Sequence, residues 1–210
     1  MKKIVLRRLV LVAGMAWLLA ACGGGGDGDA GQAGAGSAPA VAAMGTLRLA
    51  LTDAPACGFD KVFVTVEKVR VHQSGSAGDG EAGWSEVVLN PAKRLDLLSL
   101  TNGVLEELGQ KRLPAGKYTQ LRLVLAENGS TAPFANAVIP TGGTSEVALT
   151  TPSADQSGLK LKTNIDVVAS QTADFVIDFD ACKSIVTTGN SGKSGKYLLK
   201  PVLTVSRRTS

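Results

Sequence analysis

The sequence predicts an all-β fold, an antiparallel β-sandwich of about seven or eight strands with one short helix. Three observations support this prediction. Apolar and polar residues alternate in several short segments, turns rich in Gly and Pro separate these segments, and only one stretch has helical spacing. The region rich in Val, Leu, Ile and Thr extends over residues 45–206, which is a usual size for one domain.

Four segments have the period of two that is typical of a strand with one buried face. Leucine occupies every second position from 47 to 51, so residues 46–53 are expected to form the first of these strands. The same alternation recurs in residues 118–125, 159–167 and 173–180. We expect the apolar faces of these strands to form the core.

One long apolar segment changes phase. Residues 61–71 carry valines on one face as far as Val66 and on the opposite face from Val69 onward. A β-bulge near Glu67 and Lys68 would explain this switch, because an extra residue moves the following side chains to the other face.

The last apolar segment, residues 197–205, is apolar on both faces around Pro201. Because proline lacks the backbone N–H that a central strand needs, this segment is expected to be an edge strand or to contain a bulge. The single helix is expected in residues 101–110, where Leu105 and Leu108 have the spacing of a core-facing helical turn.

The chain begins like an exported protein. Four basic residues precede an uncharged stretch from Leu9 to Ala21. A helix of this stretch would cover roughly 20 Å, which is short of the roughly 30 Å hydrocarbon core, so residues 1–21 are interpreted as a cleaved signal peptide. The following Leu-Ala-Ala-Cys resembles the bacterial lipobox, a resemblance that implies lipidation of Cys22 and a stable acyl anchor in the bilayer. Gly23 in place of Asp implies sorting to the outer membrane.

Residues 22–44 are almost entirely Gly, Ala, Ser and Pro after the cysteine. This composition predicts a flexible tether with a root-mean-square span of about 25 Å. Residues 207–210 are expected to be a short tail.

Without residues 1–21, four of the 22 basic residues are lost, which leaves as many basic residues as the 18 acidic ones. The near-neutral mature protein therefore has no electrostatic footprint for nucleic acid.

The chain contains few groups for catalysis. His72 is its only histidine, so two-histidine metal sites are excluded, and no nucleophile-elbow motif accompanies it. We interpret His72 as a surface residue at a loop edge. No phosphate-binding loop or dinucleotide motif is present.

Three aspartates are the candidate metal-binding or ligand-binding residues. Asp53 follows the first predicted strand, and Asp178 and Asp180 lie two residues apart near the end of a later one. Carboxylates held together could bind calcium, which takes six to eight oxygen ligands, although one pair supplies too few. No other cofactor is expected.

Cys57 and Cys182 are expected to form a disulfide. The exported compartment is oxidising, the two remain as an even pair once Cys22 is lipidated, and both follow strand ends. This bridge would bring Asp53 and Asp180 to one end of the domain.

Several motifs together resemble one bacterial lipoprotein family, catalogued as domain of unknown function 4382. They are "LTDAP" at 51–55, "LDLLSLTNG" at 95–103, "LPAGKYTQLRLVL" at 113–125, "DFD" at 178–180 and "YLLKPVLTV" at 197–205. The "LPAGKY" turn is also similar to transthyretin-like and carboxypeptidase-regulatory-like sandwiches, which implies a Greek-key arrangement. The resemblance supports the fold and the location and implies no activity.

Two function hypotheses follow. The first is a non-catalytic, membrane-anchored module that binds an envelope protein or a polysaccharide, or has a structural role. The alternative is a carboxylate-based hydrolase, similar to a glycosidase, that uses Asp53 with Asp178 or Asp180. The first is favoured because small sandwiches bind ligands more often than they enclose a catalytic cleft.

Overall fold

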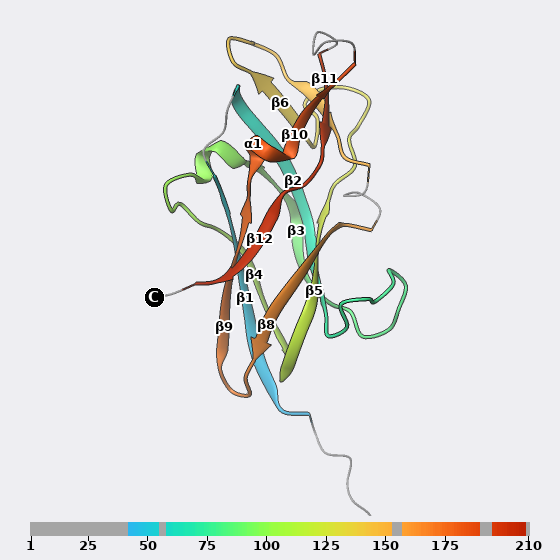
Figure 1. Ribbon diagram of the computed structural model, residues 1–210, viewed down its shortest axis with the longest axis vertical. Helices are drawn as coiled ribbons and strands as arrows, with labels where there is room; N and C mark the ends of the chain where they lie inside the picture. The colour runs from blue at the N-terminus through green and yellow to red at the C-terminus, as the bar shows by residue number, and fades with distance from the viewer. Residues whose placement is uncertain (1–41, 55–57, 153–156, 190–194, 209–210) are drawn as a thin grey trace, which may run out of the picture. The chain divides into compact units, whose positions relative to one another are not determined.

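Two β-sheets form the domain in the computed structural model (Figure 1). The structure describes residues 42–54, 58–152, 157–189 and 195–208. The predicted signal peptide, Cys22 and nearly all of the tether therefore lie outside the described residues. All described residues belong to one compact unit, Val41–Ser210.

The smaller sheet has four strands. Their order is β12 (Leu203–Arg207), β9 (Thr172–Phe179), β1 (Met44–Asp53) and β4 (Glu106–Pro114). β1 pairs with β4 in the antiparallel sense and with β9 in the parallel sense. β12 closes the other edge of β9 in the antiparallel sense.

The larger sheet is organised on the long strand β2. Its order is β10 (Ile185–Thr188), β11 (Lys196–Leu199), β7 (Val147–Thr150), β6 (Ala137–Pro140), β2 (Phe59–His72), β5 (Gly116–Leu125) and β8 (Leu159–Val167). β3 (Ser85–Asp96) also pairs with β2. β11 and β7 form a second parallel pair.

The sheet forks along β2. β6 pairs with the first part of β2, up to Phe63, whereas β5 pairs with the last part, from Val66 onward. The strands β6, β7 and β11 therefore form one branch, which begins at the first part of β2. The strands β5 and β8 form a second branch, which begins at the last part of β2. The chain passes from one branch to the other between β7 and β8.

The β-bulge expected near Glu67 is confirmed. The register of β2 with both β3 and β5 shifts between Val66 and Lys68. Val62, Val64, Val66 and Val69 are all fully buried. The bulge thus allows both halves of one strand to bury valines although the sequence changes phase.

The all-β sandwich is confirmed, but three details of the prediction are wrong. The described residues form twelve strands rather than seven or eight, and two strand pairs are parallel rather than antiparallel. Residues 101–110 are not a helix: a turn with positive φ at Asn102 and Gly103 leads into β4. Pairing with β1 and burial of Leu108 in the core outweigh the helical spacing of the segment.

The helical elements of the described residues are short. η1 (Leu97–Leu100) is a 3₁₀ turn capped by the Asp96 side chain, and α1 (Ala181–Ser184) is a single turn capped by Asp180. No helix in the described part of the chain is long and apolar enough to cross a membrane.

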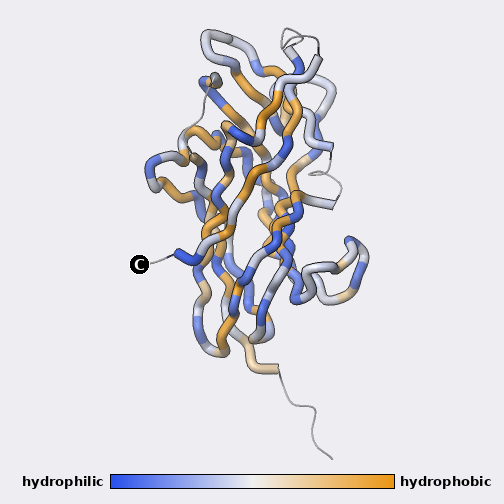
Figure 2. Tube along the Cα trace, in the orientation of Figure 1, coloured by the Kyte–Doolittle hydropathy of each residue, from blue (hydrophilic) through white to orange (hydrophobic). Residues whose placement is uncertain are grey.

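Pro201 lies between two strands rather than inside one. The chain leaves the larger sheet at the end of β11, passes through Lys200, Pro201 and Val202, and joins the smaller sheet as β12. Because proline cannot donate to a strand ladder, it suits this crossing. Figure 2 shows orange apolar and blue polar residues alternating along the strands. The core between the sheets includes Leu and Val side chains of β1, β2 and β5.

Candidate functional site

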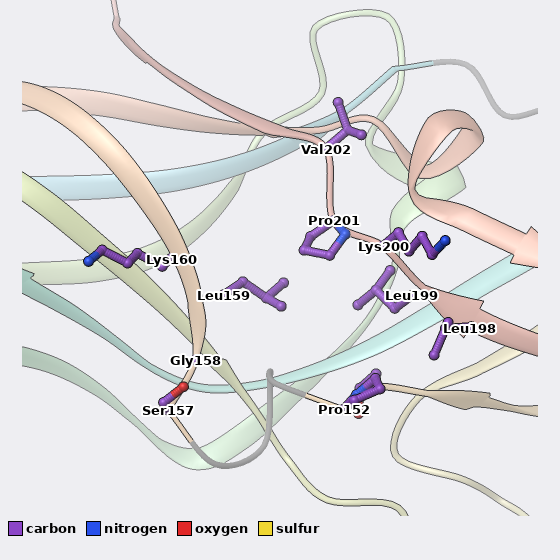
Figure 3. A pocket seen from close by; sticks show the side chains of 11 residues that line it. Pro152, Ser157, Gly158, Leu159, Lys160, Leu198, Leu199, Lys200, Pro201 and Val202 are labelled. Atoms are coloured by element: carbon purple, nitrogen blue, oxygen red, sulfur yellow. The ribbon is translucent and has the colours of Figure 1, made fainter. Parts of the chain in front are cut away.

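A pocket of about 730 Å³ lies near the fork in the larger sheet. It is bounded by the end of β7, the start of β8 and the connection between β11 and β12 (Figure 3). Its described lining residues are Thr151, Pro152, Ser157, Gly158, Leu159, Lys160, Leu198, Leu199, Lys200, Pro201 and Val202.

The walls of the pocket are mostly apolar. Leu159 and Leu199 extend toward the space between β8 and the β11–β12 connection, whereas the amino groups of Lys160 and Lys200 point away from it (Figure 3). Val202, on the connection, remains 40% exposed. Leu159 and Leu199 are only 3% and 4% exposed, so they form the floor of the pocket, and more exposed residues such as Val202 form the part that solvent reaches.

Gly158 allows this wall to approach β5. Its φ is +81°, and a Cβ atom there would lie 3.1 Å from the Leu123 carbonyl oxygen and 3.0 Å from the Val124 side chain. An L-residue would be strained in this conformation. Glycine thus lets the chain turn into β8 directly against β5.

The pocket has the size of a small-molecule site and lacks titratable acids among its described lining residues. Its composition suits burial of an apolar group rather than acid–base chemistry. Sequence analysis missed it because the residues around the β7–β8 connection form it together with the β11–β12 connection, which lies far from them in the chain. The only feature of the sequence that pointed to this region was the segment around Pro201, which is apolar on both faces.

Asp53 lies at the end of β1 and is only 5% exposed. Its Oδ1 accepts a hydrogen bond of 2.9 Å from the backbone N–H of Ala181, at the start of α1. Its Oδ2 is buried without a partner among the described residues. Burial raises the pKa of Asp53 to about 7, the Ala181 hydrogen bond opposes the rise, and the negative charge of Asp178 adds to it.

Asp180 has a different environment. It caps α1 by accepting from the backbone N–H of Lys183, and its Oδ2 lies 2.6 Å from the Lys183 ammonium. These hydrogen bonds hold the pKa of Asp180 below its usual range. Asp178 is half-buried and pairs in register with Thr52 of β1. The structure therefore brings Asp53 close to the turn that Asp180 caps, as the sequence suggested, but each has its own partner.

No group of three or more His, Cys, Asp or Glu side chains in the described residues is placed to hold a metal ion. Calcium binding by Asp53, Asp178 and Asp180 gains no support from this arrangement.

His72, interpreted as a surface residue, is in fact buried. Its Nδ1 lies 2.9 Å from the Ser74 N–H and its Nε2 lies 3.0 Å from the Ala82 carbonyl, so it fastens both ends of the β2–β3 loop.

The two cysteines flank the Asp53 contact. Cys182 follows Ala181 directly, whereas Cys57 lies outside the described residues, four positions after Asp53. The hydrogen bond from Ala181 to Asp53 joins the start of α1, which contains Cys182, to the end of β1. The disulfide between Cys57 and Cys182 stays a prediction.

We predict that Asp53→Asn raises the free energy of unfolding at pH 8 and leaves it almost unchanged below pH 4. The folded protein holds the Asp53 proton up to about pH 7, whereas the unfolded chain loses it near pH 3.8. Stability supplied by the protonated acid is therefore lost as pH rises between these values, by about 4 kcal/mol at most. Urea unfolding from pH 3.5 to 8 measures this difference.

Asp166→Asn is the matched control, because Asp166 is an exposed carboxyl on β8. Its stability profile should follow that of the unaltered protein. A destabilising effect of Asp53→Asn at pH 8 would contradict the account of Asp53 as a buried carboxyl with an unpartnered oxygen.

For the disulfide, we predict that the unreduced protein resists thiol alkylation at Cys57 and Cys182 and becomes alkylated at both after reduction. The bridge closes a loop of about 125 residues and should stabilise the fold by about 5 kcal/mol in the chain-entropy estimate. Intact-mass spectrometry after alkylation reads the result. Two alkylated thiols without reduction would contradict the bridge.

Comparison with known families identifies one match. The family described as a domain of unknown function, DUF4382, matches residues 44–201, which confirms the resemblance found in the motifs. Comparisons with curated proteins and with solved structures find no match. The matched region begins with β1 and ends at Pro201, just before β12. The chain belongs to the DUF4382 family.

Proposed function

We propose that this protein is a lipid-anchored lipoprotein of the bacterial outer membrane whose β-sandwich is a non-catalytic binding module. The apolar pocket near the fork is the ligand site. The observation that carries this proposal is the enclosure of Leu159 and Leu199 by chain segments from both branches of the sheet, which leaves an apolar space of about 730 Å³.

The ligand class follows from the lining. Pockets for small molecules are concave and mostly apolar, and a few polar groups at their margins set the orientation. No aromatic side chain is among the described lining residues, so the stacking surface that favours sugars is missing there. The pocket therefore suits an acyl chain or another apolar envelope component better than a polysaccharide.

The anchor part of the proposal depends on the sequence alone. Four basic residues, a short apolar stretch and Leu-Ala-Ala-Cys precede a Gly- and Ala-rich segment. A triacylated Cys22 would hold the protein stably in a bilayer, because two or more chains are enough for that. The tether would let the domain move about 25 Å from the lipid surface.

The carboxylate-based hydrolase is the second candidate. One observation favours it: the pKa values of Asp53 and Asp180 are displaced in opposite directions, as in acid–base pairs. Against it, Asp53 is almost fully buried and bonded to Ala181, and Asp180 is engaged by Lys183. The geometry therefore supports structural roles for both carboxyls.

We predict that Val202→Trp weakens binding of an uncharged apolar probe, N-phenyl-1-naphthylamine, about tenfold. A larger side chain on the β11–β12 connection takes space from the pocket and removes about 1.4 kcal/mol of contact. Fluorescence of the probe, excited outside the indole band, measures its affinity.

Val168→Trp is the matched control. Val168 is 41% exposed, almost the same as the 40% of Val202, but it lies outside the lining of this pocket. Its affinity for the probe should not change. Equal affinity in all three proteins, or no binding by the unaltered protein, would contradict the pocket as the ligand site.

For the anchor, we predict that Cys22→Ser abolishes labelling by an alkyne fatty acid and releases the protein into the periplasmic fraction. Serine has no thiol for the diacylglyceryl transfer that the lipobox resemblance implies. In-gel detection of the label and membrane fractionation measure the two effects. Retention of the Cys22→Ser protein in the membrane would refute lipid anchoring through this residue.

A further inference from the structure

A row of cations crosses the outer face of the larger sheet. Arg70 of β2 pairs in register with Arg122 of β5, and Arg122 pairs in register with Lys160 of β8. Side chains directly opposite one another on neighbouring strands lie about 5 Å apart at Cβ, and like charges in such positions are destabilising. Three adjacent cations are thus a costly arrangement that requires an anion.

In the structure, that anion is a carboxylate from the β2–β3 loop. Asp79 Oδ1 lies 2.5 Å from Arg70 Nη1 and 3.1 Å from Arg122 Nη1. Asp79 is 52% exposed, whereas the two arginine side chains are only 14% and 8% exposed. Solvent therefore reaches the carboxylate, and two nearly buried guanidinium groups lie beneath it.

Both arginines also make cation–π contacts with the ring of Trp84. The guanidinium carbons of Arg70 and Arg122 lie 4.5 Å and 4.8 Å from the centroid of its ring. An indole face attracts cations at such distances. The indole N–H donates to the Gly78 carbonyl, so the ring also holds the loop that carries Asp79.

The charges in this cluster do not balance. Glu86 pairs with Arg70 and Lys68, and Asp79 is shared by Arg70 and Arg122, whereas Lys160 forms no ion pair with the described residues. Nε of Arg122 is buried without a hydrogen-bond partner in the described part of the chain. Asp79 and Glu86 therefore supply two negative charges to the four cations Lys68, Arg70, Arg122 and Lys160, and one donor of Arg122 has no partner among the described residues.

We propose that Arg70, Arg122 and Lys160 form a binding site for a phosphate group, and that Asp79 occupies this site until phosphate displaces it. A phosphate monoester carries close to two negative charges and three acceptor oxygens, and guanidinium groups bind it in fork geometry. It matches three cations better than a single carboxylate does. The phosphate comes either from solution or from a lipid headgroup.

Asp79 competes as a tethered ligand. A group fixed on a short loop has an effective concentration in the millimolar range, so it weakens the binding of free phosphate in the unaltered protein. Replacing its charge removes the competitor without touching the cations. The loop itself stays attached through Ala77, whose carbonyl accepts from Arg122 and Gln120.

The test uses the emission of Trp84, which is the only tryptophan left once the predicted signal peptide, which contains Trp17, is removed. Inorganic phosphate is titrated at constant ionic strength, with chloride as the balancing anion. We expect Asp79→Asn to bind phosphate at least about tenfold more tightly than the unaltered loop, because the internal competitor is gone. Glu81→Gln is the matched control, since Glu81 lies in the same loop and contacts Gly78 instead of the arginines.

Lys160→Gln, at an exposed position, should weaken phosphate binding about fivefold in the Asp79→Asn chain, because one cation of the row is lost. A parallel titration uses phosphatidylcholine vesicles with and without phosphatidic acid. A response only to phosphatidic acid assigns the phosphate to a lipid headgroup, and a response to inorganic phosphate assigns it to solution. The proposal is overturned if Asp79→Asn responds to neither, or if Lys160→Gln leaves the affinity unchanged.

Discussion

The fork in the larger sheet at Thr65 is the constraint on which the apolar pocket depends. At this point β5 ends and β6 begins, so the backbone groups of β2 need partners that no regular strand supplies. Asn136, which is fully buried, accepts from the Thr65 N–H and donates to the Ala126 carbonyl. Asn128 accepts from the Asn136 N–H and donates to the Leu149 carbonyl. Because unpaired buried backbone groups are costly, these two amides make the fork possible.

The fork and the bulge act together. The bulge at Glu67 turns the second half of β2, so its valines face the same core as those of the first half. β5 and β8 continue along that second half, and β6, β7 and β11 continue along the first. The β11–β12 connection then crosses to the smaller sheet next to the space between the branches. The apolar space between the branches is thus a consequence of the way in which both branches pair with the same strand, β2.

The alternation of apolar and polar residues predicted those features of the fold that depend on a single segment of the chain. Alternation identified β1, β5, β8 and β9, and the phase change of the valines located the bulge. The same reasoning failed for residues 101–110, where spacing typical of a helix was overruled by pairing with β1. The expected disulfide was the reason for grouping Asp53 with Asp180, and a hydrogen bond from Ala181 does bring Asp53 to the turn that Asp180 caps. Local patterns could not find the pocket or the row Arg70, Arg122 and Lys160. Both depend on strand register, which a single sequence does not disclose.

Methyl NMR tests the central claim, that the domain binds an apolar ligand in the space between the two branches. With N-phenyl-1-naphthylamine added to the methyl-labelled protein, the account predicts that the largest shift changes occur at Leu159, Leu199 and Val202, which line the pocket. The methyl groups of Val88 and Val104, which are more exposed than Val202 but lie outside the pocket, should stay unchanged. Shift changes centred on Val88 or Val104, with none at Leu159 and Leu199, would contradict it.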